Sequence, residues 1–359
     1  MCEKRKIRET PKCSRIFLHL SNARYSYFSE TVLRNPKHYG ENLTFSTFEE
    51  LYTQYVFDLK ETVKGIYSKC SKAFSHLNAS TKNWVWAAEI PCTVVSLFEE
   101  GCIEKGLSYL EGGPIYNLYS PHIGGVADTV NSLYAIKKLV FDEQKCSFSE
   151  LMEILKSNWE QDEALRMYAL NQYSYYGNDS DEVDQLAARL LSDFADICTE
   201  LNGRCGYRFP AGVSTFGRQL EWAPKRFATP YGRYAGDILA ANCSPTPSTD
   251  KDGATAIIRS YCKIDHSKLA SGSALDIKLL PSNVAGELGL QAMVSLLKAF
   301  VSLGGFFMQP DTVDAATLRE AQRCPQDYQT LSVRISGWNA RFVTLNKEWQ
   351  DMVIAQNEH

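Results

Sequence analysis

The stretch that decides how this chain is interpreted reads Leu331-Ser332-Val333-Arg334-Ile335-Ser336-Gly337-Trp338-Asn339-Ala340-Arg341-Phe342-Val343-Thr344-Leu345. Apolar residues alternate with polar ones up to Ile335, and they return at Phe342 after a single glycine. An alternation with a period of two predicts two short strands, joined at Gly337. A glycine at a hairpin tip is common, because it adopts backbone angles that other residues avoid.

The same stretch resembles the glycyl radical signature of pyruvate formate-lyase-like enzymes. That signature is an Arg, a β-branched residue, a small residue, Gly, an aromatic residue, a polar or small residue, Ala, and soon afterwards another aromatic residue. Those places are filled by Arg334, Ile335, Ser336, Gly337, Trp338, Asn339, Ala340 and Phe342. The resemblance implies that Gly337 stores an unpaired electron on its α-carbon. The alternative is an ordinary hairpin tip.

Radical chemistry gives a reason for glycine at this position. A radical on a backbone α-carbon is stabilised when the nitrogen donates electron density and the carbonyl withdraws it, and this requires the carbon to flatten. A side chain would clash on flattening, and glycine has none. We therefore expect any other residue at position 337 to abolish the radical while still permitting a hairpin.

Length, charge and hydropathy limit the class of protein. The chain has 359 residues, 44% of them apolar, which suffices for one large or two moderate domains. A net charge of −4 gives no electrostatic case for binding nucleic acid. No apolar run approaches the length of a transmembrane helix, and the charged N-terminus lacks the apolar core of a signal peptide. We expect a cytoplasmic protein that does not bind membranes.

The cysteine pattern argues against a metal centre in this chain. Eleven cysteines are present, but none forms a C-x-x-C pair or a C-x-x-x-C-x-x-C run. Scattered thiols suit a reducing cytosol. We therefore expect no bound metal, and the resemblance implies that the chain itself needs no bound cofactor.

Helical spacing and capping signals predict most of the elements. The predicted helices cover 45–74, 91–105, 128–141 with Asp128 as its N-cap, the segment after a Ser147–Glu150 capping box, 181–201, 288–302, 314–323 and 347–356. A buried strand is predicted at 306–309, and long functional loops at 203–247. Short strands separated by helices favour an α/β fold.

The resemblance extends from about Phe45 to the end of the chain. Further landmarks of the family are matched, in order, by the segments 47–51, 102–106, 111–117, 128–141, 176–179, 244–256, 303–305 and 317–322. Members of the family are ten-stranded α/β barrels built from two half-barrels. The resemblance implies that this chain is the second half of such a barrel with its surrounding helices. It also implies a barrel part at residues 1–230, truncated at its N-terminus, and a glycine radical domain at 231–359.

The reactive cysteine of the family has no clear counterpart. In the family, a cysteine loop and a glycine loop meet inside the barrel, the glycyl radical takes a hydrogen atom from the cysteine, and the thiyl takes one from substrate. Cys2 stands at a suitable separation from Gly337, and Cys13 is a weaker choice, but neither lies in a Gly-Cys-x-Glu motif. Cys102 lies in such a motif, yet the apolar helical pattern around it predicts a buried structural thiol.

Two classes of function follow from the resemblance. The first is the radical-bearing part of an anaerobic lyase or decarboxylase that acts on a small carboxylate or aromatic molecule, with radical addition of a hydrocarbon to fumarate as its alternative. Arg218 would pair with a substrate carboxylate and Trp222 would wall an aromatic pocket; a surface salt bridge and core packing are the alternative for this pair. The second class is a non-catalytic fragment or radical-domain subunit.

Several partners are implied in either case. An activating enzyme that uses an iron–sulfur cluster and S-adenosylmethionine would install the radical. A separate chain or segment would supply the first half-barrel. A complete enzyme would be a homodimer.

Overall fold

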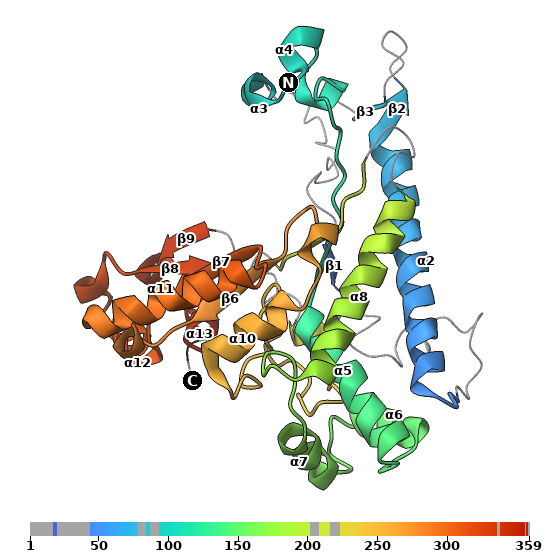
Figure 1. Ribbon diagram of the computed structural model, residues 1–359, viewed down its shortest axis with the longest axis vertical. Helices are drawn as coiled ribbons and strands as arrows, with labels where there is room; N and C mark the ends of the chain where they lie inside the picture. The colour runs from blue at the N-terminus through green and yellow to red at the C-terminus, as the bar shows by residue number, and fades with distance from the viewer. Residues whose placement is uncertain are drawn as a thin grey trace, which may run out of the picture.

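The computed structural model describes residues 17–19, 44–77, 84–86, 93–201, 208–215, 223–335, 338–355 and 357. This part is mostly helical, and its strands are short (Figure 1). The strands are β1 (Phe17–His19), β2 (Ser75–Leu77), β3 (Trp84–Trp86), β4 (His122–Gly124), β5 (Gly212–Val213), β6 (Ala274–Lys278), β7 (Phe307–Asp311), β8 (Ser332–Ile335) and β9 (Trp338–Arg341). The longer helices are α2 (Phe48–Phe74), α5 (Val126–Ile136), α6 (Phe148–Lys156), α7 (Glu163–Gln172), α8 (Asp181–Glu200), α10 (Gly253–Cys262), α11 (Gly286–Ser302), α12 (Ala315–Arg323) and α13 (Lys347–Ala355). The short ones include α3 (Thr93–Phe98), α4 (Cys102–Lys105) and the π-helix η2 (Lys137–Asp142).

Parallel strands form the centre of the molecule. β4 pairs with β1 on one side and with β5 on the other, and β6 pairs with β7. A parallel bridge between Val213 and Ser273 joins β5 to the residue just before β6. Parallel strands need long connections, and helices such as α11, which lies between β6 and β7, supply them.

The larger hydrophobic core lies between these strands and a helical layer. α5 is buried along its whole length and packs against α8, and α2 runs beside α8 (Figure 1). The strands contribute Ile123, Val213, Leu275 and Ile277 to this core. Since successive strand residues point to opposite faces, the residues between them face away from the helices.

A second, smaller core lies near the C-terminal end. It joins α12, α13 and the β8–β9 hairpin through Leu318, Val333, Ile335, Phe342 and Met352, all of them buried. β8 and β9 are antiparallel, as the alternation at 331–345 predicts.

Predictions that depend on local sequence are confirmed. Ser147 and Glu150 form the capping box of α6, and Asp314 caps α12 by accepting a hydrogen bond from the Thr317 amide at 2.6 Å. The helices predicted at 181–201, 288–302 and 347–356 are present within a few residues.

Three predictions are wrong, each for a physical reason. Asp128 does not cap a helix, because α5 already begins at Val126 and the Asp128 carboxylate is held by tertiary contacts. The helix expected over 91–105 is divided by Gly101, whose φ of 94° ends one helical segment before the next. The strand expected to be buried at 306–309 is instead largely exposed, with 45% of Phe307 accessible.

Among the described helices, none combines the length and the apolar character needed to cross a membrane.

Gly177 provides a test of close packing between the helical layer and the loop before α10. Its φ is 103°, and a Cβ at this position would lie 2.3 Å from Cγ of Pro245. Gly236 has a similar φ of 87° but has no atom within 4 Å of such a Cβ. We expect Gly177→Ala to lower the free energy of unfolding by about 1 to 3 kcal/mol more than Gly236→Ala, since only the former adds overlap to backbone strain.

Urea denaturation of the two variants and the wild type measures this difference. Equal destabilisation by the two substitutions would contradict this prediction, because it would show that the loop at Pro245 moves to accommodate the added Cβ without a cost in stability.

Candidate functional site

The residues that the sequence singled out for chemistry lie outside the described part of the chain. These are Gly337, Arg218, Trp222 and Cys2. The strands on either side of Gly337 are described: Ile335 of β8 pairs with Trp338 of β9, so residues 336 and 337 join them. The contacts of β8 and β9 therefore fix both ends of this connection.

Arg334 attaches the hairpin to the parallel strands. Its Nε donates to Oε1 of Gln309 on β7 at 2.7 Å, and its Nη1 donates to Oδ1 of Asn339 on β9 at 3.2 Å. A hydrogen bond from a charged donor is stronger than one between neutral groups. Arg334 thus fixes the two strands of the hairpin to each other and to β7.

Gln309 belongs to a polar face shared by β6 and β7. In the register of the two strands, Asp276 is beside Gln309 and Lys278 is beside Asp311. Lys278 and Asp311 form an ion pair at 2.8 Å. These residues alternate with core residues, so the face opposite the helices is polar.

The polar face continues onto β4 and β5. Nδ1 of His122 lies 2.7 Å from Oγ of Ser214, and both residues are buried. Gly212 makes room for the imidazole, because a Cβ there would lie 2.8 Å from Cε1 of His122. A buried polar strand face of this kind offers hydrogen-bonding groups to a polar small molecule.

Asp276 is the central carboxylate of this face. Asn242 donates to its Oδ2 at 2.5 Å, and Oδ1 of Asn242 accepts the Thr215 amide at 2.9 Å. Burial raises the pKa of Asp276, while the Asn242 hydrogen bond and the charges of Lys278 and Arg334 oppose that rise. The Asp276 carboxyl therefore keeps its proton to a higher pH than an exposed aspartate does.

A cavity of about 400 Å³ opens between the polar face and the hairpin. We call it the hairpin cavity. Its walls come from the loop and helix start at 241–254, from β6 and β7, from Arg334 and Ile335 of β8, and from Met352 and Asn357 at the C-terminal end. It therefore lies between the two hydrophobic cores and reaches the strand that leads to Gly337.

Buried polar side chains fix the loop that forms one wall. Asp128 accepts hydrogen bonds from the Tyr231 hydroxyl at 2.6 Å and from the Ala240 amide at 2.9 Å. Asn178 accepts from the Lys251 amide at 2.6 Å and donates to the Thr249 carbonyl at 2.7 Å. Because each group would be costly to bury without its partner, these bonds define the loop conformation.

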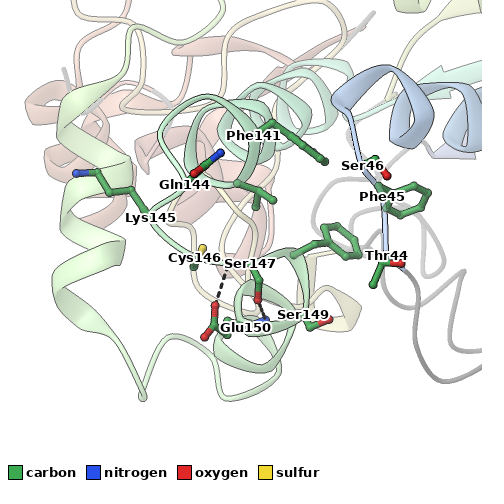
Figure 2. Close-up of a pocket in the computed structure, with 12 residues that line it drawn as sticks. Thr44, Phe45, Ser46, Phe141, Gln144, Lys145, Cys146, Ser147, Ser149 and Glu150 are labelled. Atoms are coloured by element: carbon green, nitrogen blue, oxygen red, sulfur yellow. Dashed lines mark hydrogen bonds between the residues drawn. The ribbon is translucent and has the colours of Figure 1, made fainter.

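A second hollow, of about 490 Å³, lies between residues 44–46 and the turn before α6 (Figure 2). Figure 2 shows the two hydrogen bonds of the capping box of α6. The Ser147 amide donates to the Glu150 carboxylate, and the Glu150 amide donates to the Ser147 hydroxyl. Burial raises the pKa of the Cys146 thiol to about 11, so this thiol stays protonated near neutral pH. The hollow offers no activated group.

The thiol of Cys102 is buried, with 3% of the residue exposed, as the sequence predicted. The groups that sequence reasoning missed are Asp276, Lys278, Gln309 and Asp311. The alternation of the first two with Leu275 and Ile277 is the signal that would have found them, since it predicts a strand with one polar face.

Replacement of Arg334 tests whether it anchors the hairpin. Lysine keeps the charge but cannot reproduce the paired contacts to Gln309 and Asn339. We expect Arg334→Lys to speed amide hydrogen exchange in residues 332–335 and 339–341 by about 5- to 30-fold, which corresponds to about 1 to 2 kcal/mol. Arg341→Lys, a change on the exposed side of β9, is the matched control. Unchanged exchange in both variants would contradict the anchoring role.

Comparison with known proteins places the chain in a family. The family model described as pyruvate formate lyase-like matches residues 29–222, and the one described as glycine radical matches residues 239–343. Trans-4-hydroxy-L-proline dehydratase of Clostridioides difficile is 31% identical over 325 residues, which are 89% of this chain and 39% of the relative. Indoleacetate decarboxylase of Tractidigestivibacter scatoligenes is 30% identical over 75% of this chain and 33% of its own length.

Solved structures agree with the sequence comparison. The B12-independent glycerol dehydratase of Clostridium butyricum superposes with a TM-score of 0.78 at 31% identity, over 88% of this chain and 39% of its own. A glycyl radical enzyme of Archaeoglobus fulgidus gives a TM-score of 0.79 at 28% identity, over 95% and 43%. The chain spans about two fifths of the length of these relatives. It belongs to the pyruvate formate lyase-like family of glycyl radical enzymes and contains the family's glycine radical domain.

Proposed function

We propose that this chain is the radical-bearing part of a glycyl radical enzyme and that Gly337 stores the radical. The observation that carries the proposal is the β8–β9 hairpin within the glycine radical match, anchored by Arg334 to the polar face of β6 and β7. In the proposed reaction the Gly337 radical takes a hydrogen atom from a cysteine thiol. The resulting thiyl takes a hydrogen atom from the substrate, and the atom is returned after the substrate has rearranged.

The named activities of the relatives indicate the reaction class. They include dehydratases, decarboxylases and a sulfite-lyase, all of which eliminate a group from a small molecule. We propose elimination or decarboxylation of a small carboxylate or aromatic substrate, with addition of a hydrocarbon to fumarate as the alternative. Arg218 and Trp222 remain proposed substrate contacts, and Cys2 remains a proposed site of the thiyl.

We propose that the parallel strands form the second half of a ten-stranded barrel. The order β1-β4-β5, the bridge from Val213 to Ser273, and the β6–β7 pair support this arrangement. The domain division at 230/231 remains part of the same proposal.

A partner segment that supplies the first half-barrel is also proposed. α11 carries several exposed apolar side chains, with 80% of Leu288 and 73% of Val301 accessible, and 56% of Phe306 is exposed beside β7. Apolar patches of this kind mark surfaces that pack against other polypeptide. An iron–sulfur activating enzyme that uses S-adenosylmethionine is the second proposed partner, and homodimerisation is proposed for the complete enzyme.

Anaerobic activation tests the proposed radical. With an activating enzyme of the family and S-adenosylmethionine, we expect a doublet in the electron paramagnetic resonance spectrum that is lost in Gly337→Ala. Gly65→Ala is the matched control, since a Cβ at Gly65 meets no atom within 4 Å. Exposure to air should cut the wild-type chain at position 337, which mass spectrometry detects. A doublet that persists in Gly337→Ala would overturn the assignment.

A further inference from the structure

Arg334 carries a charge that its hydrogen-bond partners do not neutralise. Among the described residues, its Nε and Nη1 donate to the side-chain oxygens of Gln309 and Asn339, and both of these are neutral amides. Lys278, the cation on the neighbouring strand β6, is already paired with Asp311 at 2.8 Å. Because a guanidinium stays protonated in proteins, the Arg334 charge is stabilised by any negative group held close to it.

Asp276 is the carboxylate that β6 places beside the Arg334 contact. It is the register partner of Gln309, so the two side chains point to the same face of the strands. Gln309 in turn accepts the hydrogen bond from Arg334, and all three residues line the hairpin cavity. Burial raises the pKa of Asp276, and the charge of Arg334 opposes that rise, so the two groups interact electrostatically.

Asn242 fixes the Asp276 carboxylate in this position. Its Nδ2 donates to Oδ2 of Asp276 at 2.5 Å, and its Oδ1 accepts the Thr215 amide at 2.9 Å. Asn242 is buried and has a φ of 49°, in the left-handed region that residues other than glycine seldom adopt. Such conformations persist where surrounding contacts enforce them, and they cluster at functional sites. The loop thus keeps a strained residue in order to hold this carboxylate.

The other charged side chains around Asp276 balance one another. Among the described residues that line the cavity, Lys278 lies on the same strand, Asp311 on β7, and Asp250 and Lys251 on the loop wall. Lys278 and Asp311 form an ion pair, and Asp250 and Lys251 have opposite formal charges. Arg334 is therefore the cation left to balance an ionised Asp276.

We propose that Asp276 is a positioning residue for the β8–β9 hairpin: its ionised carboxylate holds Arg334, and protonation of the carboxylate loosens the hairpin. Opposite charges attract strongly in a partly buried cavity, where water and salt screen them weakly. Docking of Arg334 favours the ionised carboxylate, so the stability of the docked hairpin falls as the pH falls through the titration of Asp276. The consequence for a radical rests on the function proposed for Gly337, whereas the coupling itself does not.

Amide hydrogen exchange in the full chain, without a radical, tests the coupling. Each rate is expressed as a protection factor, relative to an unstructured peptide at the same pH. From about pH 7.5 to about pH 4.5, where a buried carboxyl titrates, we expect protection in residues 332–335 and 339–341 to fall about 5- to 20-fold more than in α5. α5 reports any change in global stability.

Asp276→Asn is the variant that removes the charge and keeps the shape. An amide at this position can still accept the hydrogen bond from Asn242, but it does not titrate. We expect the variant to match the wild type at the acidic end of the range and to lack the additional hairpin protection at the neutral end. A pH dependence equal to that of the wild type, or weaker protection than the wild type at acidic pH as well, would overturn the proposal.

Two variants at the other end of the interaction guard against misfolding of Asp276→Asn. Arg334→Lys keeps the charge, so its hairpin should retain the pH dependence although protection is weaker at every pH. Arg334→Gln lacks the charge and should lose the pH dependence; its persistence would also overturn the proposal. None of these measurements requires activation, so a failure of the radical proposed for Gly337 would leave their outcome unaffected.

Discussion

The alternation of residues along β6 and β7 is the constraint on which the arrangement of the site depends. Leu275 and Ile277 point into the larger core, which forces Asp276 and Lys278 to the opposite face. The side chains of the polar face require hydrogen-bond partners. The β8–β9 hairpin supplies one, because Gln309 accepts a hydrogen bond from Arg334. A core requirement therefore determines where the hairpin that carries Gly337 is held.

Buried hydrogen bonds also fix the loop that forms a wall of the hairpin cavity. Asp128 lies in the most buried helix of the described chain, where an unpartnered carboxylate would be unstable. The Tyr231 hydroxyl and the Ala240 amide supply its partners, and each such bond to a charged group contributes about 1.5 to 3 kcal/mol. The loop that forms one wall of the hairpin cavity is thereby tied to α5.

Local signals in the sequence were sufficient to predict the elements whose stabilising contacts come from residues nearby in the chain. The cap at Ser147 and the hairpin pattern at 331–345 depend on neighbours a few residues away, and both are present. Asp128 was misinterpreted because its partners are more than a hundred residues distant. Hydrophobicity alone predicts a buried strand at 306–309, but hydrophobicity does not reveal what covers a strand. The family signature pointed to Gly337, but it could not show that Gln309 accepts a hydrogen bond from Arg334 of the hairpin.

The central claim is that the unpaired electron resides on a glycine α-carbon of this chain. The most direct measurement is the electron paramagnetic resonance spectrum of activated protein produced with glycine labelled with ¹³C at the α-carbon. The account predicts additional hyperfine splitting from the labelled carbon relative to unlabelled protein. A radical signal with identical shape in labelled and unlabelled protein would place the electron elsewhere and contradict the account.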